Sequence, residues 1–139
     1  MTAALDFPTV TAARANLKDI LDAADEHLPV TVQRDGRSSA VLDAGYLLTL
    51  LVKAVPARAE VVAEADGWSV MLPGLPIASD GPTVNAAVTE VIDALREYAE
   101  DWVTDQDLRR AVNHRGNDSV VALVHLSTDE QLRGWINGE

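Results

Sequence analysis

The stretch Leu28-Pro-Val-Thr-Val-Gln-Arg-Asp-Gly-Arg-Ser-Ser-Ala-Val-Leu42 predicts a β-hairpin. From Val30 onward apolar and polar residues alternate, which is typical of a strand with one buried face. The dipeptide Asp35-Gly36 indicates a two-residue hairpin turn, because both central positions of such a turn need a positive φ. The residues from Ser38 to Leu42 then form the returning strand.

Helical patterns lie on both sides of this hairpin. A short extended segment from Phe7 stops at Thr11, a favourable N-cap residue, and one amphipathic helix, straight or bent, follows as far as Pro29. The apolar stretch 46–52 has helical rather than alternating spacing. Residues 1–55 are therefore predicted to form a β-α-β-β-α unit. Its core is expected to consist of Leu17, Ile20, Leu21, Val30, Val32, Val41 and Leu42.

A second folded domain is predicted for residues 59–139. Asp66-Gly67 marks another hairpin turn between two short strands, and a proline-rich loop follows them. From Thr83, apolar residues recur at intervals of three and four as far as Trp102, which predicts a long amphipathic helix. This part of the chain therefore begins with two strands and one long helix.

The end of the chain carries two patterns that resemble capping boxes, in which a Ser or Thr N-cap is followed three residues later by an acidic partner. Thr104 with Asp107 would open one short helix, and Ser127 with Glu130 would open another. Between them, residues 119–126 form a compact apolar run that favours a strand. The second domain is therefore predicted as β-β-α-α-β-α, and the whole chain as an α+β protein.

The net charge of −11 is unevenly distributed along the chain. Residues 1–58 carry six basic and seven acidic residues, a net charge of −1, whereas residues 59–139 carry five basic and fifteen acidic residues, a net charge of −10. Affinity for nucleic acid depends on Lys and Arg displacing counterions from phosphates. The overall charge argues against a nucleic-acid partner, but the acidity belongs to the second part, and such asymmetry suggests two roles on one molecule.

Composition also bears on sites that the chain could hold. There is no cysteine, and the three histidines, His27, His114 and His125, are far apart, so no metal and no cofactor is expected. The acidic residues within 105–118 lack the close spacing of a ligand set, and no catalytic residue is assigned. Since there is no membrane-spanning apolar run and no signal-peptide pattern at the N-terminus, a cytoplasmic protein is expected.

Thr11-Ala-Ala-Arg-Ala-Asn-Leu17 resembles the signature of the Phd/YefM antitoxins, in which a small residue, Ala-Arg, two variable positions and Leu stand at the head of the first helix. The hairpin 28–42 is similar to the strand, basic turn and strand of that family, and Gly45-Tyr-Leu47 to its next helix start. The resemblance covers residues 8–52. It implies a homodimer, with further pairing into tetramers left open, that represses transcription by binding a palindromic operator. It also implies that the C-terminal part neutralises a toxin.

Four basic residues are predicted to contact operator DNA. Arg14 and Lys18 are four residues apart and would project from the same flank of the first helix, while Arg34 and Arg37 flank the hairpin turn. A two-fold axis would double this set to eight cations on one face. By resemblance, Arg14 and Arg34 fall where the family contacts DNA, whereas Lys18 and Arg37 are added on geometry alone. Taken singly, each residue is equally well explained as a solvated surface charge.

A second resemblance covers residues 60–103. The segment from Asp66, Asp-Gly-Trp-Ser-Val-Met-Leu-Pro-Gly-Leu-Pro, followed by Ser79-Asp-Gly-Pro-Thr-Val-Asn-Ala-Ala87, is similar to HicB-type antitoxin domains. It implies a hairpin, a proline-rich loop and a long helix, with an incomplete ribonuclease H-like core. The helix start departs from that family, since Asn85 and Ala86 replace the usual acidic residues. Because no positioned trio of acids is evident, no enzymatic activity is expected.

The acidic second domain is expected to bind the cognate toxin or to contribute to assembly. Toxins that cleave RNA are generally basic, so an acidic surface would attract such a toxin and could cover its RNA-binding face. Two other interpretations stay open. In one, the acidity only keeps a small domain soluble; in the other, the chain is an adaptor that retained the antitoxin fold without binding DNA.

Overall fold

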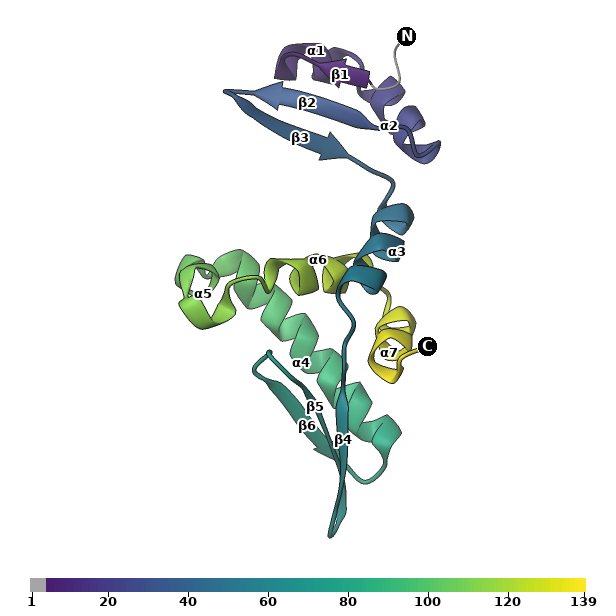
Figure 1. Cartoon of the computed structure of the whole chain (residues 1–139), viewed down its shortest axis with the longest axis vertical. Helices are drawn as coiled ribbons and strands as arrows, with labels where there is room; N and C mark the ends of the chain where they lie inside the picture. The colour runs from purple at the N-terminus through teal and green to yellow at the C-terminus, as the bar shows by residue number, and fades with distance from the viewer. Residues whose placement is uncertain (1–4) are drawn as a thin grey trace. The chain divides into compact units, whose positions relative to one another are not determined.

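The computed structural model describes residues 5–139. They belong to two compact units, unit 1 up to Leu50 and unit 2 from Leu51 to Glu139 (Figure 1). The boundary falls within helix α3 (Ala44–Ala54). Each unit combines helices with a three-stranded sheet. The predicted α+β class is therefore confirmed.

Unit 1 is built on the predicted hairpin. Strands β2 (Val30–Arg34) and β3 (Arg37–Val41) pair antiparallel around Asp35-Gly36, whose φ angles are 49° and 76°. These positive values are what a two-residue hairpin turn requires. A third strand, β1 (Leu5–Phe7), lies parallel to β2 and gives the order β1-β2-β3.

The helix before the hairpin begins earlier than predicted and is interrupted. Thr9, not Thr11, is the N-cap, because its hydroxyl accepts a hydrogen bond from a backbone N–H of the first turn at 3.0 Å. Helix α1 (Val10–Ala15) ends at Asn16, whose side chain donates to a carbonyl of the preceding turn at 2.8 Å. Such local bonding competes with the helical backbone. Helix α2 (Leu17–Asp25) is therefore a separate element.

The core of unit 1 is small and differs from the predicted one. It consists of four buried residues with three partly buried residues packed against them: Ala13, Ile20, Ala23 and Val30, then Phe7, Val32 and Val41. Two residues predicted for the core, Leu17 and Leu21, are 56% and 51% exposed, and Leu42 is exposed as well. Ile20 and Ala23 occupy the buried face of α2, so the two leucines, one turn apart, lie on an adjoining flank.

Unit 2 opens with an antiparallel sheet of order β4-β5-β6. Strands β4 (Glu60–Glu64) and β5 (Gly67–Leu72) form the predicted hairpin. Strand β6 (Ile77–Gly81) pairs with the other side of β5, although the sequence predicts no strand between the proline-rich loop and the long helix. Ala78, Asp80 and Gly81 are poor strand formers. The connection 73–76 is nevertheless short enough to return the chain directly along β5, and this pairing outweighs the weak propensity.

Strand β4 is an exposed edge of this sheet. Within the described structure it pairs with β5 alone, and all five of its residues are exposed. They include Val61 and Val62, which point to opposite faces of the sheet. The helix that covers the sheet makes its main contacts with β5 and β6, so β4 lies outside that cover.

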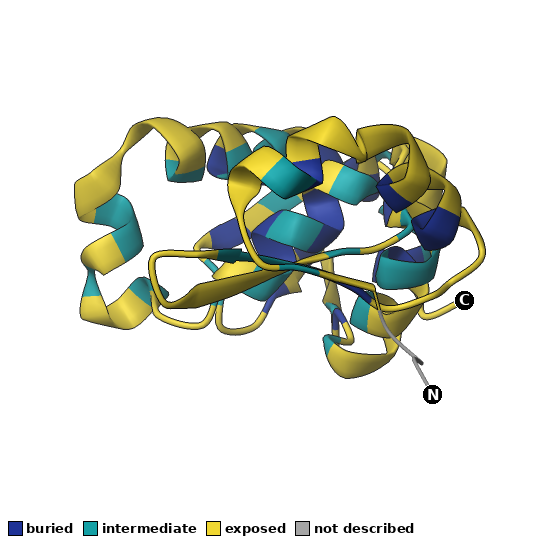
Figure 2. Ribbon diagram, turned by 90° about the horizontal axis from the view of Figure 1, so that it is seen from above, coloured by how far each residue is buried: buried dark blue, intermediate teal, exposed yellow. Residues whose placement is uncertain are grey.

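That covering helix, α4 (Val84–Thr104), organises unit 2 and begins after Thr83 as predicted. One side of α4 packs against β5 and β6, and it also contacts α6 (Asp118–Leu126) and α7 (Asp129–Asn137) (Figure 1). Figure 2 shows buried and exposed positions alternating along the helices, as amphipathic elements require. The buried residues of α4 are Ala87, Val88, Val91, Ile92, Leu95 and Tyr98.

Residues 119–126 belong to a helix, not to the predicted strand. Four residues of α6 are buried at a spacing that places them on one side of a helix: Val120, Val121, Leu123 and Val124. A short apolar run rich in β-branched residues suits a strand or a buried helix equally well, and here packing against α4 favours the helix. With β6 added and this strand removed, the predicted order β-β-α-α-β-α for the second domain is wrong.

Neither predicted capping box forms as predicted, and both helices take the following residue as their N-cap. The first short helix begins after Asp105, whose carboxylate accepts two backbone N–H bonds. Thr128 and Gln131 form the capping box of α7. Ser127 is not its N-cap, since the buried hydroxyl of Ser127 donates to a carbonyl in the last turn of α6 at 2.6 Å. The elements between α4 and α6 are α5 (Gln106–Arg110) and the 3-10 helix η1 (Val112–His114).

Replacement of Gly81 by alanine is expected to destabilise unit 2. A Cβ at this position would lie 2.5 Å from the backbone nitrogen of Ala87 and 2.9 Å from the carbonyl carbon of Ala86, in the first turn of α4. Strand and helix would have to separate, which lowers the free energy of unfolding by about 1–3 kcal/mol. Urea denaturation measures the loss. In the control Gly134→Ala, the Cβ meets nothing closer than 3.8 Å, so the free energy of unfolding is expected to stay the same or to rise. Equal losses in both variants would contradict this packing argument.

Candidate nucleic-acid interface and partner-binding groove

Two arginines lie opposite each other at the tip of the unit 1 hairpin. Arg34 ends β2, Arg37 begins β3, and they form the last paired position before the turn. Both are exposed, and Nε of Arg34 lies 3.7 Å from Oδ2 of Asp35. Like charges directly opposite in an antiparallel pair weaken the pairing. The hairpin tip is therefore a position where a bound anion would relieve repulsion.

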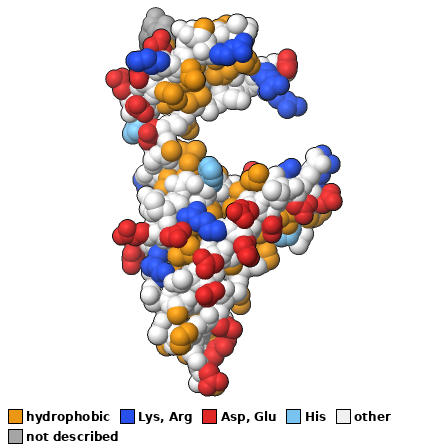
Figure 3. Space-filling view, turned by 180° about the vertical axis from the view of Figure 1, so that it is seen from behind, with side chains coloured by type: hydrophobic (Ala, Val, Ile, Leu, Met, Phe, Trp, Pro, Cys, Tyr) orange, Lys and Arg blue, Asp and Glu red, His pale blue; other side chains and the backbone are white. Residues whose placement is uncertain are grey.

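Arg14 and Lys18 lie on separate helices, although the sequence predicts one. Arg14 is in the last turn of α1 and Lys18 in the first turn of α2, with the break at Asn16 between them. Nζ of Lys18 lies 2.7 Å from Oδ2 of Asp22, and the hydrogen bond and charge of Asp22 raise the pKa of Lys18. These two cations are exposed but not joined by one continuous helix. Figure 3 shows basic side chains spread along unit 1 on the face in view.

A series of side-chain hydrogen bonds, here called the Asp6 ladder, crosses the sheet that carries the hairpin tip. Oδ1 of Asp6 accepts hydrogen bonds from Oγ1 of Thr31 at 2.6 Å and from Nε2 of Gln33 at 2.8 Å. Nε2 of Gln33 also donates to Oγ of Ser38 at 3.1 Å, so the ladder crosses all three strands. The bonds from Gln33 and Thr31 hold the pKa of Asp6 below its ordinary value of 3.8. The sequence alone gives no sign of this ladder, because Asp6 and Gln33 are 27 residues apart.

The start of α3 is tied to the loop that precedes β2. Asp43 accepts a hydrogen bond from the backbone N–H of Tyr46 at 2.9 Å, and its Oδ2 lies 3.8 Å from Nε2 of His27. The ring of His27 stacks on that of Tyr46, with their centroids 4.5 Å apart. This cluster connects the two ends of the hairpin within unit 1. It gives His27 a structural contact, where the sequence offered no role for it.

Helices α1 and α2 leave large apolar side chains uncovered in a single copy of unit 1. Leu17 and Leu21 are both more than half exposed. Val10 and Leu28 are also exposed, and Figure 3 shows hydrophobic side chains gathered on this unit. Helical spacing places Leu17 and Leu21 next to each other, and adjoining apolar side chains exposed on a soluble protein are available for contact with another protein. This surface, Val10, Leu17, Leu21 and Leu28, is called the apolar surface of unit 1.

Unit 2 carries a row of carboxylates along the solvent side of α4. Glu90, Asp93, Glu97 and Glu100 follow one another at intervals of three, four and three, and all four are exposed. This spacing places them on one side of the helix. Each like-charged pair at such spacing costs an isolated helix about 0.2–0.5 kcal/mol. Among the described residues none of the four forms an ion pair, and Figure 3 shows acidic side chains across this unit.

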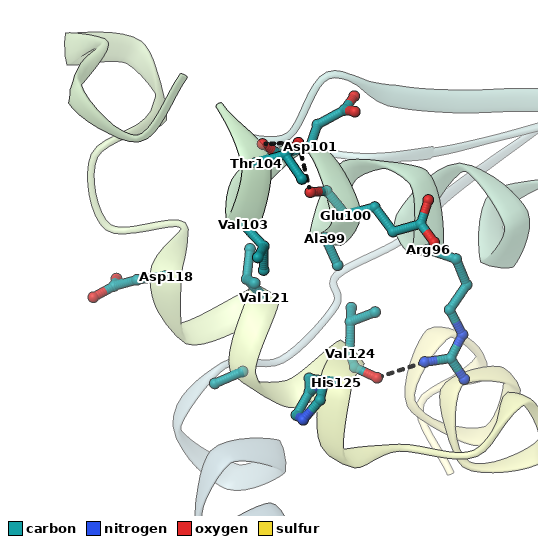
Figure 4. Close-up of a pocket in the computed structure, with 11 residues that line it drawn as sticks. Arg96, Ala99, Glu100, Asp101, Val103, Thr104, Asp118, Val121, Val124 and His125 are labelled. Carbon is teal, nitrogen blue, oxygen red and sulfur yellow. Dashed lines mark hydrogen bonds between the residues drawn. The ribbon is translucent and has the colours of Figure 1, made fainter. Parts of the chain in front are cut away.

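A groove of about 820 Å³ lies beside this acidic row, between α4 and α6 (Figure 4). Glu100 of the row and Asp118 at the start of α6 contribute carboxylates to its rim. The groove is not predictable from the sequence alone, because it depends on residues 118–126 forming a helix. Its apolar lining consists of Ala99, Val103, Val121, Ala122 and Val124.

The surfaces described in unit 1 and in unit 2 are both suited to binding another molecule. In the part of the chain that the structure describes, no group of three or more His, Cys, Asp or Glu side chains is placed to hold a metal ion. None of the described helices, the 21-residue α4 included, has the length and apolarity to cross a membrane. Unit 1 presents cations beside an apolar surface, and unit 2 presents carboxylates beside an apolar groove.

Comparison with protein families identifies the class of binding protein. A family model named PHD_like, described as an antitoxin of toxin-antitoxin, RelE / RelB, TA system, matches residues 5–131. The chain therefore belongs to this family of toxin-antitoxin antitoxins. Since the match runs from β1 into α7, both units are included in the family.

A solved structure has the same fold. It is described as an antitoxin part of a proposed toxin/antitoxin system from Syntrophomonas wolfei subsp. wolfei. The TM-score is 0.80 at 20% sequence identity, and the alignment covers 97% of this chain and 96% of that chain. At this identity the likeness concerns the fold. No curated protein sequence matches the chain, and neither match bears on the HicB resemblance.

The pKa of Asp6 is expected to change when Gln33 is replaced and to stay unchanged when Ser38 is replaced. Gln33→Ala removes a hydrogen bond to the carboxylate, so the pKa should rise toward 3.8, whereas Ser38→Ala leaves both bonds to Asp6 and should keep it low. Carboxyl-detected NMR titration measures both values. Because the ionised form is favoured in the fold, its contribution to stability is present above the unfolded-state pKa and is lost as the pH falls through the lowered folded-state pKa. An unchanged pKa in Gln33→Ala would show that the ladder does not form in solution.

Proposed function

We propose that this antitoxin is a homodimeric transcriptional repressor, in which paired copies of unit 1 bind operator DNA and the acidic unit 2 neutralises a basic toxin. An RNA-cleaving toxin would suit this charge, because such enzymes need basic surfaces for their substrate. The distribution of charge supports the division of roles. Unit 1 carries four basic and seven acidic residues, a net charge of −3, while unit 2 carries seven and fifteen, a net charge of −8. No catalytic step is part of the proposal.

The observation that carries DNA binding is the pair of arginines at the hairpin tip. Arg34 and Arg37 are exposed and opposite each other on a sheet that the Asp6 ladder braces. Two guanidinium groups on a rigid turn suit phosphate oxygens, which arginine can bind through two N–H groups at once. Arg14 and Lys18 are proposed as further DNA contacts from α1 and α2. The resemblance to Phd/YefM antitoxins supports Arg14 and Arg34 in particular.

Dimerisation is proposed to occur through the apolar surface of unit 1. Complete burial of a leucine side chain contributes about 1.5–3 kcal/mol, and about half of Leu17 and of Leu21 is still exposed in one copy. A second copy related by a two-fold axis would cover these side chains. It would also double the four cations of unit 1 to eight, in a symmetric arrangement that matches a palindromic operator.

An adaptor protein that does not bind DNA is the second candidate. The observation in its favour is that two of the four cations already have acidic neighbours, Lys18 with Asp22 at 2.7 Å and Arg34 with Asp35 at 3.7 Å. Both pairs are exposed, so each contributes little and phosphate can displace it. We therefore favour the repressor, and the dependence of DNA binding on these residues separates the two candidates.

The double variant Arg14→Ala, Arg34→Ala is expected to lose operator binding. Wild-type protein should prefer the DNA upstream of its own gene to a random duplex, with an affinity that falls steeply between about 50 and 200 mM salt. Each phosphate contact that is lost should reduce the slope of log Kd against log salt by about 0.9. Fluorescence anisotropy with labelled duplexes measures both the affinity and the slope.

Arg110→Ala with Arg115→Ala is the matched control, because it removes the same charge from exposed positions of unit 2. This variant should bind DNA as wild type does. If the two double variants lose affinity equally, Arg14 and Arg34 are not the DNA contacts. A wild-type protein without preference for its own upstream DNA would support the adaptor instead.

Leu17→Glu with Leu21→Glu is expected to convert the dimer into a monomer. Two carboxylates on the apolar surface of unit 1 could not be buried without partners, and both positions are already exposed, so the single chain should still fold. Sedimentation velocity should show the apparent mass fall from twice 14.9 kDa to 14.9 kDa. Val112→Glu, at a 76% exposed position of unit 2, is the control that should stay dimeric. A monomeric wild type would rule out the proposed arrangement.

A further inference from the structure

The groove between α4 and α6 is a preformed apolar cleft. Its lining includes Val103, which is 72% exposed although it lies in the last turn of α4. Figure 4 shows Val103 and Ala99 extending from α4 on the side where Val121 and Val124 of α6 lie. A large apolar side chain left this exposed at the wall of a groove is available for contact with another molecule.

Hydrogen bonds hold the two helices of the groove at a fixed separation. From α4, the guanidinium of Arg96 donates to the carbonyl of Val124 at 2.6 Å and to that of Ser127 at 2.8 Å, at the end of α6. Before the start of α6, the hydroxyl of Tyr98 lies 2.8 Å from Nδ1 of His114 and accepts a bond from Nδ2 of Asn117 at 3.0 Å. Two of the lining positions carry small side chains, Ala99 on α4 and Ala122 on α6, so space remains between the helices.

The charge beside the groove determines the kind of protein partner that the groove can bind. Glu100 belongs both to the groove and to the acidic row of α4 that begins at Glu90. Arg96, the one cation of α4, is bound to Asp129 and to the end of α6, so it does not neutralise the row. A second copy docked symmetrically through its own unit 2 would bring another acidic row against the first. A basic partner would instead gain attraction along the whole row.

We propose that the groove between α4 and α6 docks a basic amphipathic helix of the toxin. Apolar side chains of that helix would fill the space beside Val103 and Ala122, and its Lys and Arg side chains would face the carboxylates from Glu90 to Glu100. The stretch from Glu90 to Val103 is roughly 20 Å long at 1.5 Å per residue, which matches about four turns of a partner helix. The inference rests on the proposed neutralisation of a toxin by unit 2.

A designed peptide tests the groove with full-length protein. The probe is a labelled peptide of about 18 residues with leucines on one helical side and Lys and Arg on the adjoining side. A peptide of identical composition in scrambled order controls for charge alone. Anisotropy at low and high salt should show binding of the ordered peptide at least about tenfold tighter than of the scrambled one, with both weakened by salt.

Variants locate the binding on the protein. Asp93→Asn, Glu97→Gln, Glu100→Gln should weaken binding of the ordered peptide about tenfold, whereas Asp66→Asn, Asp80→Asn, Glu130→Gln removes the same charge from exposed positions outside the row and the groove and should change it less than about twofold. Val103→Asn should weaken binding about three- to fivefold. Val112→Asn, at an equally exposed valine outside the groove, should leave binding unchanged.

Several outcomes would overturn this assignment. Equal losses in the two triple variants, or equal binding of the ordered and scrambled peptides, would show that net charge alone attracts the probe. A change of sedimentation in Val103→Asn with unchanged peptide binding would show that a second copy covers the groove.

Growth of cells that express the cognate toxin distinguishes a failure of the proposed function from a failure of the docking site alone. If wild type does not restore growth, the proposed function is wrong. If wild type and the α4 triple variant restore growth equally, unit 2 or another part of the chain neutralises the toxin without this groove, and only the docking site is wrong.

Discussion

The burial of one side of α4 is the interaction on which unit 2 depends. A helix of 21 residues is roughly 30 Å long, and its apolar side needs cover from β5 and β6 and also from α6 and α7. At the border of this buried side, Arg96 satisfies carbonyl groups at the end of α6 and binds Asp129 at the start of α7. The opposite side of α4 is left to solvent, and the carboxylates occupy it. The same helix therefore provides the core of the unit and its most acidic surface.

The parts of the fold that sequence analysis predicted correctly are those set by local physical chemistry. The turn at Asp35-Gly36 needs positive φ angles at two adjacent positions, and these residues tolerate them. The apolar spacing of α4 persists over several turns and fits no other element. Residues 119–126 were misjudged because the strand propensity of their valines is outweighed by packing against α4. Strand β6 was missed because its pairing with β5, not its composition, makes it a strand.

The site was less predictable than the fold, since it depends on contacts between distant residues. The pairing of Arg34 with Arg37 follows from the hairpin and is visible in the sequence. The relation of Arg14 to Lys18 assumed one helix, and a single side-chain hydrogen bond from Asn16 ends that helix between them. The groove of unit 2 could not be found before α6 was known to be a helix. The exposure of leucines predicted for the core of unit 1 likewise reflects how few residues one copy can bury.

The open edge at β4 has a consequence for the protein at high concentration. An uncovered strand with valines on both faces is a template for intermolecular β-structure and aggregation. Glu60 and Glu64 stand at the two ends of this strand, and in an antiparallel pairing of two copies each would face the other. Their repulsion acts as a gatekeeper against fibrous self-association. The colloidal stability of this antitoxin therefore depends on two carboxylates that take no part in its core.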